Sequence, residues 1–178
     1  MRDLGVVGAS SRAITREAGA NLAAITYHFG SKDELVAEAL LGTIRTALDP
    51  ALAALRRDDL EAPARVMLAV AALRSSFAAS SAEAPGYVEA LVQARHLPTL
   101  QAGLLALVDE LREFFASQIA AQQAAGQLPG WIQPRPMATL ILAVLNGIVL
   151  QAVLDPAGTD VDALAGQFVA LLLAAGQR

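Results

Sequence analysis

Apolar residues recur at helical spacing along almost the whole chain. Val66, Val70 and Leu73 are four and three residues apart, so they would lie on one side of a helix with about 3.6 residues per turn. A longer stripe repeats this pattern across residues 104–119. The sequence has no convincing alternation of apolar and polar residues bounded by turn residues, so a β-sheet is not expected. The sequence therefore predicts an all-α protein.

Proline, glycine and capping residues divide the helical pattern into segments. We expect helices at residues 11–18, 22–28, 32–48 with an extension past Pro50, 61–79, 86–96, 99–125, 135–154 and 160–175. Short helices with polar caps give way to long apolar helices near residue 48. We therefore expect two domains, at residues 1–48 and at residues 49–178.

Composition excludes several kinds of chemistry. The chain has 178 residues, enough to bury a core, and no cysteine, which excludes disulfides, thiolate metal sites and cysteine nucleophiles. His28 and His96 are its two histidines, and no set of His, Asp and Glu has the spacing of a metal site. The sequence has no P-loop, dinucleotide-binding or G-x-S-x-G motif. We expect no metal, no cofactor and no enzymatic activity.

Charge is unevenly distributed along the sequence. The formal net charge is −4, and residues 49–178 contain 8 basic and 12 acidic side chains. Residues 4–32, in contrast, carry Arg12, Arg16 and Lys32 against a single acidic residue. The small N-terminal segment is therefore the basic part of an acidic protein.

One apolar run has almost the length of a membrane span. Residues 137–154 are eighteen residues without a charge, close to the lower limit for crossing a bilayer. Asn146, Gly147 and Gln151 interrupt this run, no basic cluster flanks it, and an apolar helix can equally be buried in a protein interface. The N-terminus also lacks the pattern of a signal peptide. We expect a cytoplasmic protein without a membrane-spanning helix.

Residues 10–29 have the pattern of two short helices joined by a tight turn. Ser10 or Ser11 can cap the first helix, and Asn21 can cap the second. Gly19 stands where the chain must turn, a position that suits a positive φ. This arrangement is a helix-turn-helix, in which the second helix can enter the major groove of DNA.

A capping box follows the second helix. In Ser-Lys-Asp-Glu, residues 31–34, the Ser31 hydroxyl can accept from the Glu34 amide while the Glu34 carboxylate accepts from the Ser31 amide. The helix N-terminus that this box organises is a site for anions, and Lys32 adds a positive charge there.

The segment REAGANLAAITYHFGSKDEL, residues 16–35, resembles the helix-turn-helix signature of the TetR family of transcriptional regulators. In that signature an Ala-Gly turn precedes a recognition helix ending in Tyr-x-Phe, and Gly-Ser-Lys then leads into a helix with an acidic start. The remainder of the chain resembles the family in architecture alone. That architecture is a helical regulatory domain whose last two helices pair with their copies in a homodimer.

The resemblance implies roles for particular residues of the N-terminal segment. The candidate DNA-binding residues are Ser10, Ser11, Asn21, Leu22, Ala23, Thr26, Tyr27, His28 and Lys32. Tyr27, His28 and Lys32 would contact phosphates. The recognition helix has no arginine or lysine for paired contacts to guanine, whereas Leu22 and Ala23 could meet thymine methyl groups. We expect modest specificity for each half-site, restored by dimerisation.

Two features depart from the family pattern. Thr15 stands where the family usually has alanine at the helix crossing, which requires either a slight separation or a hydroxyl bonded back to the preceding turn. The family's first helix is nearly missing, because little more than residues 1–5 precedes the second. Either the sequence begins late or DNA binding is weakened.

Residues clustered around the apolar stripes of the middle helices are candidates for an effector site. They are Arg74, Phe77, Gln93, Arg95, His96 and Gln101. Arg95 and His96 are the best candidates for polar groups inside a mostly apolar pocket, although a surface position near a helix end is at least as good an interpretation. The few charges and many Leu, Val and Ala residues predict a small, largely apolar effector.

The two C-terminal helices are each apolar on two faces. The candidate residues for a dimer interface are Leu140, Val144, Ile148, Gln151, Leu164, Phe168 and Leu171. A helix of this kind must bury one face within its own subunit and the other against something else. Two such helices from each of two subunits would form a four-helix bundle.

These features predict a homodimeric transcriptional regulator, a repressor that binds a palindromic operator in double-stranded DNA and is released by a small apolar effector. The alternative is a helical small-molecule-binding dimer that does not bind DNA, which the short N-terminus favours. An enzyme is not expected, because the sequence contains no recognisable nucleophile and base pair.

Overall fold

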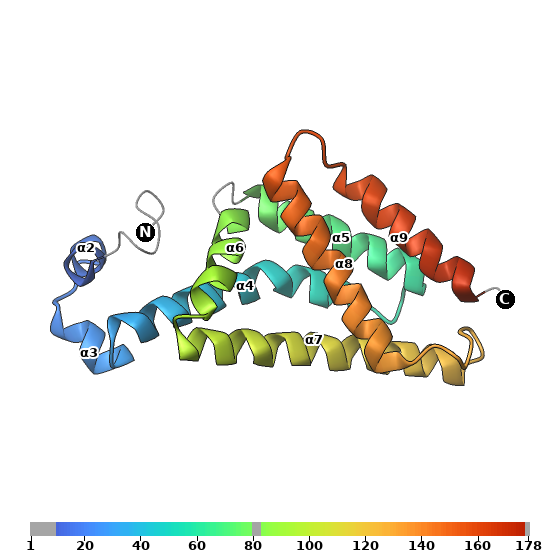
Figure 1. The fold of residues 1–178 in the computed structure, drawn as a ribbon, viewed down its shortest axis with the longest axis horizontal. Coiled ribbons are helices and arrows are strands. Elements are labelled where there is room, and N and C mark those ends of the chain that lie inside the picture. Colours follow the sequence, from blue (N-terminus) through green and yellow to red (C-terminus); the bar gives the residue numbers. More distant parts are fainter. Residues whose placement is uncertain (1–9, 80–82, 177–178) are drawn as a thin grey trace. The chain divides into compact units, whose positions relative to one another are not determined.

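A computed structural model describes residues 10–79 and 83–176 (Figure 1). The helices are α2 (Ser11–Glu17), α3 (Ala23–Phe29), α4 (Lys32–Leu55), α5 (Ala62–Ala79), α6 (Glu83–Ala94), α7 (Pro98–Ala124), α8 (Pro134–Leu154) and α9 (Val161–Gly176). No strand occurs in these ranges, so the predicted all-α fold is confirmed. The helices agree with the predicted segments to within three residues at each end, once the extension past Pro50 is included.

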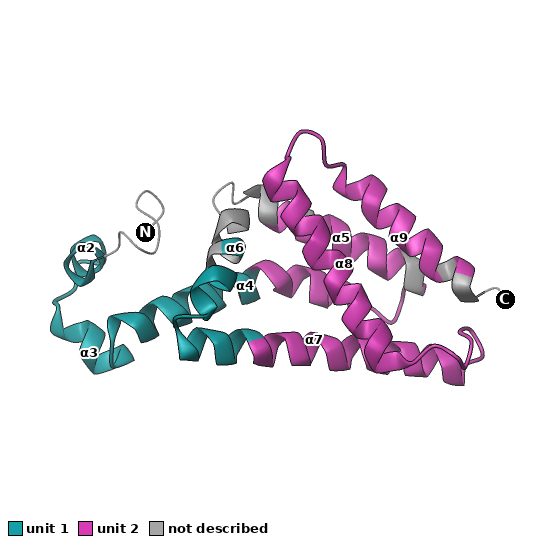
Figure 2. Ribbon diagram, viewed as in Figure 1, with its two compact units in different colours: residues 1–46, 80–104 teal, residues 47–79, 105–178 magenta. Residues whose placement is uncertain are grey.

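The chain divides into two compact units (Figure 2). Unit 1 comprises residues 1–46 and 80–104, and unit 2 comprises residues 47–79 and 105–178. Unit 1 thus takes in α6 and the start of α7, which the division predicted from the sequence assigns to the second domain. Both α4 and α7 contribute residues to each unit.

The buried core of unit 1 includes residues from the start of α4 and the start of α7. Val36, Ala37 and Leu100 are almost completely buried. Gly103 allows close approach at this point, because a Cβ there would lie 2.3 Å from Leu41 Cδ1. This part of unit 1 therefore packs through aliphatic side chains and one close contact that glycine permits.

In unit 2, α4 continues through Pro50 and packs on α5. An interior proline removes a backbone hydrogen bond and costs about 3 kcal/mol or more. The residues that follow it, Ala51 and Ala54, form a buried cluster with Ala69 of α5. Small side chains at this crossing allow the two helices to lie close together, and burial of this cluster acts against the cost of Pro50.

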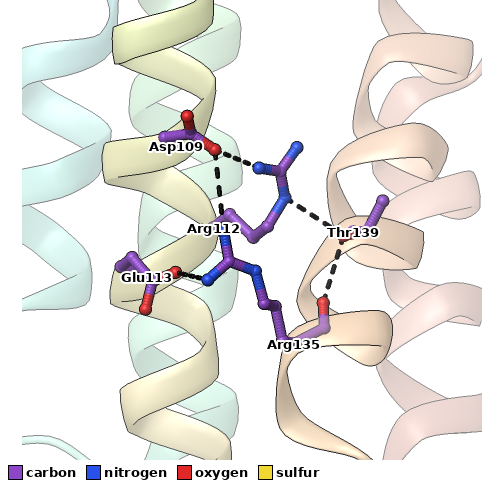
Figure 3. Close-up of polar contacts among 5 residues, drawn as sticks. All are labelled: Asp109, Arg112, Glu113, Arg135 and Thr139. Carbon is purple, nitrogen blue, oxygen red and sulfur yellow. Dashed lines mark hydrogen bonds and ion pairs between the residues drawn. The ribbon is translucent and has the colours of Figure 1, made fainter.

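Ion pairs hold α8 against α7 in unit 2 (Figure 3). Arg135 Nη1 lies 2.6 Å from Glu113 Oε1, and Arg112 Nε donates to Thr139 Oγ1 at 3.2 Å. Arg112 also pairs with Asp109 on its own helix. Exposed pairs of this kind contribute little to stability, at most about 1 kcal/mol each. Their effect is to fix which side of α8 faces α7.

Candidate functional site

The helix-turn-helix is built from local hydrogen bonds in unit 1. Ser10 Oγ accepts from the Ala13 amide at 3.2 Å at the start of α2, and Asn21 Oδ1 accepts from the Ala24 amide at 2.9 Å at the start of α3. Gly19, between the two helices, has a φ of 62°. The predicted capping by Ser10 and Asn21 and the positive φ at Gly19 are confirmed. The order of α2, turn and α3 is therefore set by short-range contacts.

Thr15 is buried inside this motif, with 7% of its surface exposed. Its hydroxyl donates to the Ser11 carbonyl oxygen at 3.0 Å and lies 3.4 Å from the Arg12 carbonyl oxygen. Of the two alternatives for this position, the bond back to the preceding turn is therefore the one observed. A buried hydroxyl that is satisfied within its own helix leaves the motif intact.

The predicted DNA-binding residues gather on and beside α2, α3 and the first turn of α4. All of them are exposed except Ser11 and Lys32, which are half-buried. Tyr27 is 84% exposed, and its ring meets that of His28 edge to face at a centroid distance of 4.8 Å. A tyrosine so exposed contributes little to the core, and its hydroxyl is available to a partner.

Two further arginines belong to this surface. Arg12 and Arg16 are four residues apart on α2, and both are exposed. Among the described residues, no ion pair joins either of them or Lys32 to an acidic side chain. In the sequence analysis these arginines were identified only by their local positive charge. Their spacing of four residues places them on one side of α2.

The capping box at the start of α4 forms only in part. Ser31 Oγ accepts from the Glu34 amide at 3.1 Å, as predicted. We expected the Glu34 carboxylate to accept from the Ser31 amide, but this hydrogen bond does not form. Glu34 Oε1 instead accepts from the Thr99 hydroxyl of α7 at 3.0 Å. A partner 65 residues away thus replaces the local one, and it ties the start of α7 to the start of α4.

Unit 2 encloses an apolar cavity of about 240 Å³. Residues of α4, α5, α7, α8 and α9 line it, together with the loop between α7 and α8. Among the described residues of the lining, Phe114, Phe115 and Phe168 are aromatic, and the polar side chains are Arg65, Gln118 and Gln122. A concave, mostly apolar site with few polar groups is typical of small-molecule binding.

Arg57 and Arg65 pair differently with acidic residues of the loop between α4 and α5. Arg57 Nε donates to Asp59 Oδ1 at 2.8 Å, and this hydrogen bonding lowers the pKa of Asp59 to about 2. Arg65 Nη1, in contrast, lies 4.0 Å from Asp58 Oδ1, beyond hydrogen-bonding distance. Arg65 therefore has a distant counter-ion, whereas Arg57 has a close one.

The four predicted effector residues that the structure describes do not line the cavity. Arg95, His96 and Gln101 are exposed and Gln93 is half-buried, and all four belong to unit 1. The side chains of Arg74 and Phe77 lie outside the described residues. An effector role for these six residues remains a prediction. The polar groups of the cavity were missed, although Gln118 and Gln122 continue the helical face of Phe114 at steps of four residues.

The predicted interface residues of α8 and α9 separate into two groups. Leu140, Leu164 and Leu171 are 59%, 43% and 61% exposed, Gln151 is exposed and Val144 is half-buried. Ile148 and Phe168 instead line the cavity of their own subunit. Each helix therefore has an apolar face on the cavity and a second apolar face that is exposed in a single chain.

The exposed face of α8 makes this helix resemble a membrane span. Pro134–Leu154 is long and apolar enough to cross a bilayer, and only 11% of its most apolar window is buried. The core helix of a soluble protein can pass the same test of length and composition. Ion pairs from Arg135 in its first turn join it to α7, so one face of the helix is packed on protein.

The chain matches known regulatory proteins in sequence. Residues 3–39 match the family model described as bacterial regulatory proteins of the tetR family. Residues 62–174 match the family model described as the C-terminal part of BetI-type transcriptional repressors. No curated protein sequence matches the chain. The two family models together account for most of its length.

Solved structures share the fold at low sequence identity. A transcriptional regulator from Rhodococcus sp. Rha1 is 23% identical, with a TM-score of 0.74 over 99% of this chain and 91% of that one. A candidate transcriptional regulator from Saccharomonospora viridis, solved in complex with choline, is 21% identical, with a TM-score of 0.71 over 97% and 88%. The TetR family transcriptional regulator PfmR from Thermus thermophilus is 19% identical, with a TM-score of 0.65 over 99% and 93%.

Proposed function

Since this chain belongs to the TetR family of bacterial regulatory proteins, we propose that it is a cytoplasmic transcriptional repressor that binds an operator as a homodimer and is released by a small molecule. The chief support for DNA binding is the exposed end of α3, where Tyr27 and His28 lie, together with the basic residues Arg12 and Arg16 of α2 and Lys32 of α4 in the same unit. A polyanion is the partner that this combination suits.

Phosphate contacts would set the position of α3 on the duplex. Tyr27 and His28 carry hydrogen-bonding groups at the end of α3, and Lys32 lies in the first turn of α4, where backbone amides also attract anions. Asn21, Leu22 and Ala23 at the start of α3 would then face the base edges. Without arginine or lysine on α3, each half-site would be read by thymine methyl contacts and by shape.

Two half-sites read together would supply the specificity that one lacks. The exposed leucines of α8 and α9 are the proposed dimer contact, because an apolar surface of this kind is stabilised when a second copy covers it. An isologous pair of these helices would form a four-helix bundle. The interface needs on the order of 1,600 Å² of buried surface for a stable pair.

The cavity of unit 2 would hold the effector, and α4 would carry its influence to the DNA-binding segment. Leu48, Leu52 and Leu55 of α4 line the cavity, while the first turn of the same helix follows α3 after Gly30 and Ser31. A ligand that binds one arrangement of α4 better shifts the population toward that arrangement. If that arrangement fits the operator poorly, the ligand weakens DNA binding by the same coupling free energy.

Selection of bound fragments from a random DNA library tests this function. The purified chain should enrich a palindromic sequence and bind it at least about a thousandfold more tightly than unrelated DNA at physiological salt. A small molecule that fills the cavity should lower that affinity. A chain that enriches no sequence but still binds small molecules would contradict the proposal, and would indicate instead a helical ligand-binding dimer that does not read DNA.

A further inference from the structure

The cavity of unit 2 carries a single formal charge among the described residues that line it. That charge is the guanidinium of Arg65, in the first turn of α5. Gln118 and Gln122 are the other polar side chains of the lining, and no Asp or Glu lines the cavity within the described ranges. The site is therefore apolar with one positive charge.

The Arg65 side chain is largely buried, and its ion-pair partner among the described residues is not close. Its side chain is 18% exposed, whereas the side chain of Asp58, 4.0 Å away, is fully exposed at 100%. A carboxylate at this distance accepts no hydrogen bond from the guanidinium, which has five N–H donors. Partial burial of a charge is unfavourable unless a partner compensates it, so a ligand that supplies an anion would find a prepared site.

The polar groups of the cavity lie toward one end of unit 2. In Figure 1, α5 and α7 run in opposite directions, so the first turn of α5 and the last turns of α7 point to the same end. Arg65 belongs to that turn of α5, and Gln118 and Gln122 belong to those turns of α7. Leu73 and Leu111 line the cavity further along the same two helices, away from that end. The three polar side chains of the described lining therefore belong to one end of these two helices, where apolar residues such as Leu128 and Ile132 also line the cavity.

We propose that the effector is an amphipathic anion, a carboxylic acid with an unbranched apolar chain, whose carboxylate pairs with Arg65. A guanidinium fits a carboxylate through two parallel hydrogen bonds, and the two glutamine amides can donate to the same group. The apolar chain occupies the part of the cavity lined by leucine and phenylalanine. This choice of effector class rests on the proposed function as a regulator released by a small molecule.

A cationic effector fits this lining poorly. The similar structure from Saccharomonospora viridis holds choline, but here Arg65 would repel a quaternary ammonium group, and no carboxylate among the described lining residues would attract it. Arg56 Cζ already lies 5.8 Å from the ring centroid of Phe114, so a cation occupies one side of an aromatic residue that could otherwise bind choline. The two proteins therefore share a fold, and we expect this chain to bind a different class of small molecule from choline.

Binding of three matched probes to the full chain tests the effector class without DNA. The probes are octanoate, octan-1-ol and octyltrimethylammonium, which share an apolar chain and differ in head group, and Trp131 beside the lining residue Ile132 is the chain's one tryptophan and a fluorescence reporter. At pH 7 octanoate should bind about tenfold or more tightly than octanol, and the ammonium compound most weakly. Equal binding of acid and alcohol, tighter binding of the cation, or no binding of any probe would overturn the proposal.

Substitution of Arg65 separates charge from packing. Arg65→Gln should weaken octanoate binding by about tenfold to a hundredfold while octanol binding changes less than about threefold. Arg65→Lys, which keeps the charge without the planar fork, should recover part of the loss. Arg57→Gln is the matched control, because Arg57 is an exposed arginine that does not line the cavity, and it should leave all three affinities unchanged. An equal loss for octanoate and octanol in folded Arg65→Gln protein would overturn the role of Arg65.

Operator binding distinguishes a failure of this inference from a failure of the proposed function. If the chain binds its selected operator but shows no preference for octanoate, the effector class is wrong and the regulator remains. If octanoate binds in the expected order but the chain selects no operator, the anion site stands and the proposed function fails.

Discussion

The helix-turn-helix of unit 1 and the last two helices of unit 2 expose opposite kinds of side chain. At the end of α3 the exposed residues are Tyr27 and His28, which carry hydrogen-bonding groups. On α8 and α9 they include Leu140, Leu164 and Leu171. Polar side chains can exchange water for a charged partner and return to it, whereas a contiguous apolar face is unstable in water. The difference agrees with the proposed partners, which are DNA for unit 1 and a second subunit for unit 2.

The largest effect is expected on the exposed apolar face of α8 and α9, which we propose is covered by a second subunit. Leu140→Glu would place a carboxylate in the interface twice, once from each subunit, and should raise the dimer dissociation constant roughly a thousandfold. Leu105→Glu is a matched control, since Leu105 on α7 and Leu140 on α8 are both 59% exposed. Analytical ultracentrifugation measures the change. A dimer that tolerates Leu140→Glu as well as Leu105→Glu would break the contrast between the two units.

The interior of unit 1 should be as sensitive to truncation as an ordinary core. Leu100 is fully buried, and Leu100→Ala should lower the free energy of unfolding by about 3 kcal/mol through lost contacts and a residual cavity. Urea denaturation followed by circular dichroism measures this loss. Leu105→Ala, at an exposed site on the same helix, should cost less than about 0.5 kcal/mol. Similar losses for the two variants would mean that Leu100 is not a core residue.

The cap of α4 should contribute a smaller and local share of stability. Ser31→Ala removes the acceptor for the Glu34 amide and should lower the free energy of unfolding by about 1 kcal/mol. Hydrogen exchange should show the loss at the amides of the first turn of α4. Protection unchanged at the Glu34 amide would indicate that the Ser31 hydroxyl is not its partner.

The smallest effect on folding is expected at the proposed phosphate contact of α3. Tyr27→Phe removes one hydroxyl from a residue that is 84% exposed, so folding should be unaffected. Affinity for DNA should fall about tenfold at most, and equally for every variant of the operator, because a phosphate carries no sequence information. Fluorescence anisotropy with a set of operator variants measures this. A selective loss on one variant would show instead that Tyr27 reads a base.

The helix-turn-helix could be predicted from the sequence because its determinants are local. Ser10, Asn21 and Ser31 each cap a helix through an amide three residues away. Thr15 bonds to a carbonyl four residues back in its own helix. Contacts at such short range follow from residue order, so the pattern of capping residues and glycines was sufficient to place them.

The cavity and the second half of the capping box could not be predicted in this way. The cavity lining comes from five helices, and no spacing within one helix shows which of its apolar faces turns inward. For this reason Ile148 and Phe168 were grouped with interface residues, and Arg65 was not identified. The Glu34 carboxylate accepts from Thr99, 65 residues away, although a local partner was available. Tertiary packing decided each of these contacts.

The most direct test of the central claim is the salt dependence of binding to the selected operator. The logarithm of the association constant should fall linearly and steeply with the logarithm of salt concentration, because phosphate contacts release counterions. Lys32→Ala should reduce this slope by about 1 and weaken binding to all DNA alike. A slope near zero, or a slope unchanged in Lys32→Ala, would contradict a polar surface in unit 1 that binds the DNA backbone.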